Sequence, residues 1–259
     1  MNEPRDPAPP TNRGRGIYLL PNLLTTGGLF GGFFAIIAAS QGRYEAACVA
    51  IFVSAIMDGV DGRVARMTNT QSEFGVQYDS LSDLVSFGMA PALVMYHWSL
   101  VATKAFGPMA GKAGWLAAFT YAACAALRLA RFNSQVASVD KRWFVGLASP
   151  AAAALMASFV WTLHDLGHSG DVWVGLALPL TVLTGLLMVS RIRYHSFKGG
   201  GDGPRGERVP FVFLVIALAV LVALVLDPPK VLLAAAVLYA LSGPLGWLWR
   251  RARGHGTAA

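Results

Sequence analysis

Long apolar stretches recur along most of this 259-residue chain, whose mean hydropathy is +0.51. A helix needs roughly 20 apolar residues to cross a bilayer, and these stretches are about that long. Backbone groups in lipid must satisfy their hydrogen bonds internally, so the chain is expected to fold as an all-α, polytopic bundle of membrane helices. We expect about eight spans, at 18–40, 44–66, 80–102, 113–133, 147–165, 172–190, 209–226 and 231–249.

Polar stretches flank and separate the apolar runs. Residues 1–16 are rich in Pro, Gly and charge, and are expected to form a disordered tail. The first apolar run is too long for a cleaved signal peptide and is interrupted by Pro21-Asn22, so we expect it to be retained. The remaining chain divides into a six-helix core, a flexible basic loop, two additional helices and a basic tail, at 17–195, 196–208, 209–249 and 250–259.

Lysine and arginine are distributed unevenly between the two ends of the expected helices. One side carries only Arg43, Lys104, Lys112 and Lys230, which leaves 17 of the 21 basic residues for the other side. Because cytoplasmic connections are enriched in basic residues, both termini are expected on the cytoplasmic side. Basic loops therefore account for the net charge of +7, and we expect no nucleic-acid partner.

Four aspartates fall within 26 positions between two apolar runs: Asp58, Asp61, Asp79 and Asp83. The first pair is three residues apart near the end of the second expected helix, and the second pair is four apart at the start of the third. Each spacing places both carboxylates on one helical face. The connection over 67–77 is long enough to let the two helix ends meet. Because the carboxylates would repel one another, a hard divalent cation such as Mg²⁺ or Mn²⁺ is expected among them.

The neighbours of the aspartates favour a phosphate-binding site. Gly59 and Gly62 would let a ligand or another helix approach the backbone closely. Arg63 and Arg66 supply positive charge for a phosphate. The structural alternative is that Asp79 caps the third helix, or that the acids pair with arginine for stability alone. Four carboxylates at these spacings favour function, because ionisable residues within a membrane are functional candidates by default.

The aspartates belong to a longer motif. Asp58-Gly59, Asp61-Gly62, Ala65-Arg66, Gly75, Asp79 and Asp83 follow the pattern D-G-x-D-G-x2-A-R-x8-G-x3-D-x3-D. With this motif the chain resembles the CDP-alcohol phosphatidyltransferases. The stretches LLPNLLTTGGLFGGFFA, NTQSEFGVQYDSLSDLVSFGMAPAL, ALRLARFN and GLASPAAAAL resemble bacterial members of that family that use L-serine, over roughly residues 17–160. The resemblance implies transfer of a phosphatidyl group from CDP-diacylglycerol to L-serine, giving phosphatidylserine and CMP.

The resemblance also implies roles for the matching positions. Asp58, Asp61, Asp79 and Asp83 would hold two Mg²⁺ or Mn²⁺ ions, and Asp83 would also be the general base. CDP-diacylglycerol would be bound by Pro21, Asn22, Leu23, Leu24, Thr25, Gly62, Arg66 and Ser72. The acceptor or the reacting phosphate would be bound by Arg128, Arg131 and Asn133, for which ordinary basic charge at the end of a span is the alternative.

The family resemblance further implies a six-helix catalytic core over 17–195, with its site at the cytoplasmic face of a bacterial inner membrane. The resemblance also implies two further membrane spans after this core and a homodimer. Membrane lipids are expected to surround the protein. One alternative is a sister enzyme that uses glycerol 3-phosphate or an inositol phosphate. A cation transporter is a second alternative, but its acids would be expected near the membrane midplane on broken helices.

Overall fold

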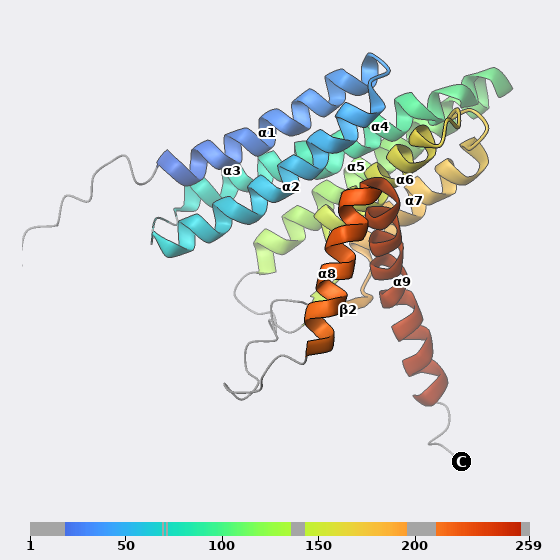
Figure 1. Cartoon of the computed structure of the whole chain (residues 1–259). Coiled ribbons are helices and arrows are strands. Elements are labelled where there is room, and N and C mark those ends of the chain that lie inside the picture. Colours follow the sequence, from blue (N-terminus) through green and yellow to red (C-terminus); the bar gives the residue numbers. More distant parts are fainter. Residues whose placement is uncertain (1–18, 69, 71, 136–142, 196–210, 255–259) are drawn as a thin grey trace, which may run out of the picture.

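The structure, a computed structural model, describes residues 19–68, 70, 72–135, 143–195 and 211–254. Over these residues the fold is a helix bundle with one small two-stranded sheet (Figure 1). The all-α prediction is therefore confirmed for the described part. The elements are α1 (Leu19–Ser40), α2 (Tyr44–Met67), α3 (Glu73–Asp83), η2 (Leu84–Met89), α4 (Ala90–Trp98), η3 (Leu100–Phe106), α5 (Pro108–Gln135), β1 (Trp143–Val145), α6 (Ser149–Asp165), α7 (Val174–Val189), β2 (Arg193–His195), α8 (Phe211–Leu226) and α9 (Pro228–Gly254).

Helices α1 and α2 form a hairpin along one side of the bundle (Figure 1). The chain reverses at Gly42, whose φ of +76° is a conformation that residues with a side chain rarely adopt. Glycines on α1 allow the close approach, because a Cβ added at Gly31 would collide with the Ser54 side chain of α2. Small residues at helix contacts are the usual means of packing helices in a membrane.

The third helical segment begins earlier than predicted. The sequence predicts a start at residue 80, but α3 begins at Glu73, and the Ser72 hydroxyl accepts a hydrogen bond from the Gly75 N–H at 3.0 Å. Ser72 is therefore the N-cap, and the alternative that Asp79 caps this helix is wrong. The first turns of α3 are polar, so hydropathy alone does not reveal them.

The same segment changes its helical geometry directly after Asp83. The residues of η2 form a π-helix, a geometry that is often associated with functional sites. Beyond α4, the chain bends by 43° into the 3₁₀ helix η3. Gly107, with a φ of +105°, then reverses the chain into α5.

Three described helices are long and apolar enough to cross a membrane, over Leu20–Ser40, Pro108–Ser134 and Pro228–Trp249. The bent pair Glu73–Trp98 and Leu100–Phe106 passes the same test as one unit. Helices α6, α7 and α8 have only 17, 16 and 16 residues, and the last ten residues of α2 contain four charged side chains. The chain is thus a polytopic helical membrane protein with three to four candidate spans, and the count of eight stays a prediction.

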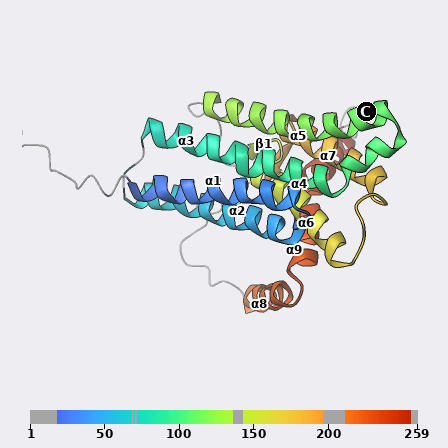
Figure 2. The same ribbon diagram turned by 90° about the horizontal axis from the view of Figure 1, so that it is seen from above.

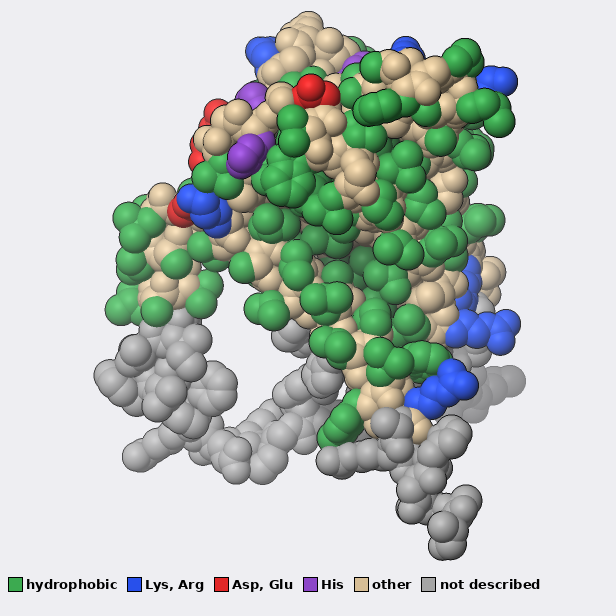
Figure 3. Space-filling view, turned by 90° about the vertical axis from the view of Figure 1, so that its right-hand side faces the viewer, with side chains coloured by type: hydrophobic (Ala, Val, Ile, Leu, Met, Phe, Trp, Pro, Cys, Tyr) green, Lys and Arg blue, Asp and Glu red, His purple; other side chains and the backbone are tan. Residues whose placement is uncertain are grey.

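The surface agrees with a membrane environment. Large apolar side chains are exposed along many helices, including Phe30, Ile56, Leu127 and Leu238. Figure 3 shows one face, where hydrophobic side chains are spread over the whole described surface and charged ones lie mainly near its margins. Exposed apolar area on this scale is stable when lipid, and not water, surrounds the helices.

The C-terminal helix α9 docks on the core, mainly along α6. The strands β1 and β2 pair antiparallel and place Tyr194, which is fully buried, against α9. The Tyr194 hydroxyl donates a hydrogen bond to the Ala240 carbonyl at 3.1 Å, and the absence of a side chain at Gly243 leaves room for the Tyr194 ring. Helix α8 lies at the edge of the bundle beside α9 (Figure 2).

The predicted N-terminal tail over 1–16 and the predicted loop over 196–208 lie outside the described residues. The predicted tail over 250–259 is described only as far as Gly254, where α9 ends.

Candidate active site

Three of the four predicted aspartates meet between α2 and α3. Asp58 and Asp61 come from α2 and Asp79 comes from α3, and each offers an oxygen such that these atoms all lie within 4.8 Å of one another. Asp61 is buried and the other two are half-buried. A cluster of carboxylates without sulfur or nitrogen donors suits a hard divalent cation. The expected convergence of these three residues is confirmed.

Asp83 lies at the end of α3, one turn after Asp79. It lines the same narrow pocket as the three other aspartates and interacts electrostatically with all of them. It is not part of the group whose oxygens lie within 4.8 Å. Its other electrostatic partner is Arg128 of α5. Asp83 thus stands at the edge of the cluster and interacts electrostatically both with the three aspartates and with an arginine.

Helix α1 orients one of the clustered carboxylates. The Thr25 hydroxyl donates to Asp61 Oδ2 at 2.6 Å and also lies 3.1 Å from the Pro21 carbonyl oxygen. A group that hydrogen-bonds to a metal-binding side chain, without binding the metal itself, fixes the orientation of that side chain and tunes its basicity. The sequence predicts Thr25 in the CDP-diacylglycerol site, and the structure gives it a direct contact with Asp61.

A group of serine hydroxyls ties three helical segments together beside the aspartates. Ser54 of α2 and Ser86 of η2 both donate to the Gly28 carbonyl of α1, at 2.9 and 3.0 Å. Ser82 of α3 donates to the Thr25 carbonyl at 3.1 Å. The sequence analysis missed this group. The sequence feature that could have revealed these serines is the glycine-rich stretch of α1 together with isolated serines in apolar helices. That pattern is typical of close helix packing.

The residues predicted to bind CDP-diacylglycerol lie at one end of the bundle, where α1 begins, α2 ends and α3 begins (Figure 1). Asn22 and Ser72 both approach Gly75, because a Cβ added there would lie 3.5 Å from Asn22 Oδ1 and 3.2 Å from Ser72 Oγ. Pro21 is buried and Leu24 is half-buried. Leu23 is 68% exposed, so it is the one member of the stretch 21–25 whose side chain mostly faces outward.

Open space adjoins the glycines of the motif on α2. A Cβ added at Gly59 would meet no atom within 4 Å, and one at Gly62 would meet only Arg66 Nη1, at 3.8 Å. No helix of the described chain presses on these two positions. The interpretation that they admit a neighbouring helix is therefore not supported by this structure.

The predicted acceptor residues are all on α5 but make different contacts. Arg128 donates from Nη1 to Ser149 Oγ of α6 at 2.7 Å and interacts with Asp83. Asn133 donates from Nδ2 to Ser80 Oγ of α3 at 2.9 Å. Arg131 is half-buried, one turn from Arg128. The structure thus brings Arg128 to the acidic cluster and Asn133 to the neighbouring face of α3.

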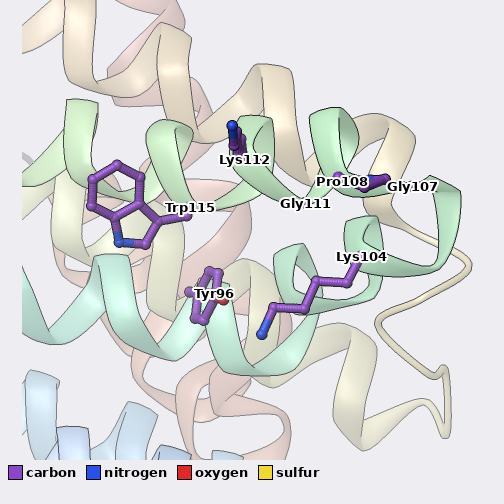
Figure 4. A pocket seen from close by; sticks show the side chains of 7 residues that line it. All are labelled: Tyr96, Lys104, Gly107, Pro108, Gly111, Lys112 and Trp115. Carbon is purple, nitrogen blue, oxygen red and sulfur yellow. The ribbon is translucent and has the colours of Figure 1, made fainter.

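A larger pocket lies elsewhere, between α4, η3 and the start of α5. It is lined by Tyr96, Lys104, Gly107, Pro108, Gly111, Lys112 and Trp115 (Figure 4). Tyr96 is 13 residues beyond Asp83, which is about 20 Å along helical segments. Lys104 extends toward Tyr96, whereas Lys112 projects away from them (Figure 4). Lys104 and Lys112 do not point toward one another, so the pocket lacks a pair of cations that could bind the same anionic group.

Comparison with known proteins agrees with the motif. The family model described as CDP-alcohol phosphatidyltransferase matches residues 18–189. A Helicobacter pylori protein named CDP-diacylglycerol–serine O-phosphatidyltransferase is 35% identical over 233 residues, which are 90% of this chain and 92% of that protein. A Mycobacterium tuberculosis protein of the same name is 38% identical over 218 residues, covering 82% of this chain and 73% of that protein.

The similarity extends into the archaea and beyond the family model. A Methanocaldococcus jannaschii protein, also named CDP-diacylglycerol–serine O-phosphatidyltransferase, is 30% identical over 198 residues, which are 76% of this chain and 82% of that protein. An alignment that covers 90% of the chain cannot stop at residue 189, so the likeness to the Helicobacter pylori protein continues into the C-terminal helices. The aspartate cluster lies inside the matched region, and the chain belongs to the CDP-alcohol phosphatidyltransferase family.

Proposed function

We propose that this chain is a CDP-diacylglycerol–serine O-phosphatidyltransferase, which transfers a phosphatidyl group to L-serine and releases CMP. The observation that carries this conclusion is the similarity to serine-using relatives, which spans 90% of the chain in the Helicobacter pylori protein and encloses the aspartate cluster. The sister acceptors, glycerol 3-phosphate and inositol phosphates, have no comparable support among these relatives.

The aspartate cluster fits a divalent cation, and we propose Mg²⁺ or Mn²⁺, with two ions. The support is the set of three carboxylates with oxygens within 4.8 Å of one another, and Asp83 beside them. Asp58, Asp61 and Asp79 would hold the metal, and Asp83 would contribute at the edge. When bound, such ions neutralise charge on the attacking and leaving oxygens of a phosphoryl transfer.

The reaction needs a base for the serine hydroxyl. Its oxygen attacks the phosphorus that carries diacylglycerol, a new P–O bond forms, and the P–O bond to the CMP oxygen breaks. The hydroxyl proton must leave, and a positioned carboxylate is a suitable acceptor. Asp83 fits because it borders the pocket but lies outside the closest group of carboxylates. CMP departs with the electron pair of the broken bond.

The CDP part of the substrate would lie beside the ends of α1, α2 and α3. Gly59 and Gly62 leave space over α2, and Arg66 follows them on the same helix with a planar guanidinium that can hold two phosphate oxygens. Asn22 and Ser72 adjoin this region at Gly75. We propose that these residues, with Pro21, Leu24 and Thr25, bind the nucleotide end while the acyl chains stay in the bilayer.

We also propose a setting for the reaction. The distribution of basic residues favours both termini and the site on the cytoplasmic side of a bacterial inner membrane. The family model over 18–189 supports a catalytic core close to the predicted 17–195. A homodimer and eight spans complete this proposal.

An acceptor panel tests the function. Purified protein in detergent with CDP-diacylglycerol and Mg²⁺ should release CMP and form a new lipid with L-serine, but not with glycerol 3-phosphate or inositol phosphate. Release with a phosphorylated acceptor and none with serine would reassign the protein to a sister activity.

The metal assignment has its own test. Chelation with EDTA should abolish turnover, because four neighbouring carboxylates cannot bind a pyrophosphate without a cation between them. Adding Mg²⁺ or Mn²⁺ in excess over EDTA should restore it. Full activity in EDTA would rule out the metal site.

A further inference from the structure

The π-helix η2 joins the helix that carries Asp79 and Asp83 to the core of the bundle. At its end, the Ala90 N–H bonds to the Val85 carbonyl, five residues back, where an α-helix would bond four residues back. This turn therefore holds one extra residue, and one residue corresponds to a rotation of about 100° around a helix. The direction in which α3 presents its two carboxylates thus depends on the geometry of η2.

The two helices that η2 joins are held to different degrees. Six of the nine residues of α4 are buried, so core packing fixes this helix. In α3, Ser82 is the one buried residue among eleven. The orientation of α3 against α2 therefore depends on its connection through η2 and on its contacts with α1.

Side-chain hydrogen bonds hold η2 from two neighbouring helices. The Ser86 hydroxyl donates to the Gly28 carbonyl of α1 at 3.0 Å. The hydroxyl of Tyr121, from α5, donates to the Phe87 carbonyl at 3.1 Å. Tyr121 is fully buried, and a buried hydroxyl is costly to leave without a partner. The Tyr121 hydroxyl therefore holds the backbone of η2 four residues after Asp83.

Close packing keeps Tyr121 in place. A Cβ added at Gly88 of η2 would lie 3.1 Å from the Ala125 Cβ, and one at Gly185 of α7 would lie 3.1 Å from the Tyr121 Cα. Helix α5 is thus packed tightly against both η2 and α7 near Tyr121. In a close-packed region of this kind, Tyr121 cannot move away from η2 unless its neighbours repack.

We propose that Tyr121 is a positioning residue, which fixes the π-helical turn so that Asp79 and Asp83 face the aspartates of α2 in a geometry that binds a divalent cation. It acts through the Phe87 carbonyl and touches neither the metal nor a substrate. This proposal rests on the proposed function, and it extends the support of the metal site to a residue outside the aspartate motif.

The test removes two hydroxyls that bond the same run of helices. Tyr121→Phe removes the donor to the Phe87 carbonyl. Tyr44→Phe is the matched control, because the Tyr44 hydroxyl donates to the His97 carbonyl at 2.9 Å. His97 is 14 residues beyond Asp83, which is about 20 Å along helical segments.

Mn²⁺ binding is measured directly, from the electron paramagnetic resonance signal of the free ion, with both variants and the unchanged enzyme in detergent. Phosphatidylserine formation and Tm are measured on the same preparations. Tyr121→Phe should raise the dissociation constant for Mn²⁺ roughly threefold to tenfold, the effect of one lost hydrogen bond. Tyr44→Phe should lower Tm but leave Mn²⁺ binding as it was.

An unchanged dissociation constant for Mn²⁺ in Tyr121→Phe, or an equal rise in both variants, would overturn the proposal. Failure of the unchanged enzyme to bind Mn²⁺ or to make phosphatidylserine would instead refute the proposed function, so the two failures are distinguished.

Discussion

The two ends of the acidic cluster differ at the level of single residues. Asp58 shares a group of oxygens within 4.8 Å with Asp61 and Asp79, whereas Asp83 stands outside that group and interacts electrostatically with Arg128. Asp58, at the centre of the group, is suited to binding the metal before the reaction begins. Asp83, at the edge of the group, is suited to accepting a proton in the transition state. The geometry therefore supports different roles for carboxylates of identical chemistry.

Replacing each of these residues with asparagine should separate the roles. Asp83→Asn keeps the size but cannot take the serine proton, so turnover should fall by roughly 10²–10⁴ while CDP-diacylglycerol still binds. Asp58→Asn should lose metal-dependent binding as well as turnover. Affinity for the nucleotide lipid at fixed Mg²⁺ is the measurement. Equal loss of binding in both variants would make Asp83 chiefly a metal ligand.

Thr25 gives a second prediction at this scale. Thr25→Val is close in shape but removes the hydroxyl that bonds Asp61 Oδ2. The Mg²⁺ concentration for half-maximal activity should rise about 10–100-fold, the range for lost partners of metal ligands. Thr26→Val is the control, because the Thr26 hydroxyl bonds the Asn22 carbonyl and Tyr78 and no aspartate. An unchanged Mg²⁺ requirement in Thr25→Val would remove Thr25 from the support of the site.

At the scale of elements, the site depends on how closely α1 approaches its neighbours. Gly28 accepts bonds from two other segments, and Gly31 and Gly32 permit the contact with α2 and η2. The π-helix directly after Asp83 changes the direction of the side chains that follow, and places Ser86 toward α1. The metal-binding carboxylates are thus positioned by helix packing as much as by the motif.

A side chain at Gly32 should disturb this packing. A Cβ there would lie 2.7 Å from the backbone Cα of Ser86, which cannot move aside alone. Gly32→Val should cost about 1–3 kcal/mol by overpacking, seen as a lower Tm in detergent together with reduced activity. Gly175→Ala on α7 is the control, since a Cβ at that position meets nothing within 4 Å. Equal Tm values for the two variants would contradict the packing argument.

At the scale of the whole molecule, the motif residues lie at one end of the helices. The end that the sequence predicts to carry few basic residues is the opposite one. Arg63 and Arg66 lie where α2 ends, and Arg43 and Lys104 lie at the opposite turns, before α2 and before α5 (Figure 1). The charge asymmetry predicted from the sequence is therefore an asymmetry between the two ends of the bundle. This is the arrangement expected when one end faces the cytoplasm.

Cysteine labelling in intact cells tests this orientation. A membrane-impermeant maleimide should label Gln41→Cys and His168→Cys from outside, but should not label Ser134→Cys until the membrane is opened. All three positions are exposed in the structure, and the native Cys48 and Cys124 are buried, so the background should be low. Labelling of Ser134→Cys from outside, with Gln41→Cys protected, would invert the topology.

Much of this protein was predictable from its sequence, because the relevant signals are local. Apolar runs of about 20 residues indicated each of the main helical segments, and the spacing of Asp58, Asp61 and Asp79 indicated that their carboxylates would converge. The motif alone indicated the family, and the match to the family model confirmed it. Helical periodicity and the cost of burying charge in lipid depend on residues within a few helical turns of one another. Both can therefore be inferred from the local sequence.

Other features were decided only by the tertiary structure. The start of α3 at Glu73 depends on a cap by Ser72, in a stretch too polar to stand out as a span. The hydrogen bonds from Thr25 to Asp61 and from Ser82 to the Thr25 carbonyl join residues that are 36 and 57 positions apart. Such contacts depend on which helices pack together and how closely glycines let them approach. The periodicity of residues along a single helix does not specify these contacts, because they depend on which other helix packs against it.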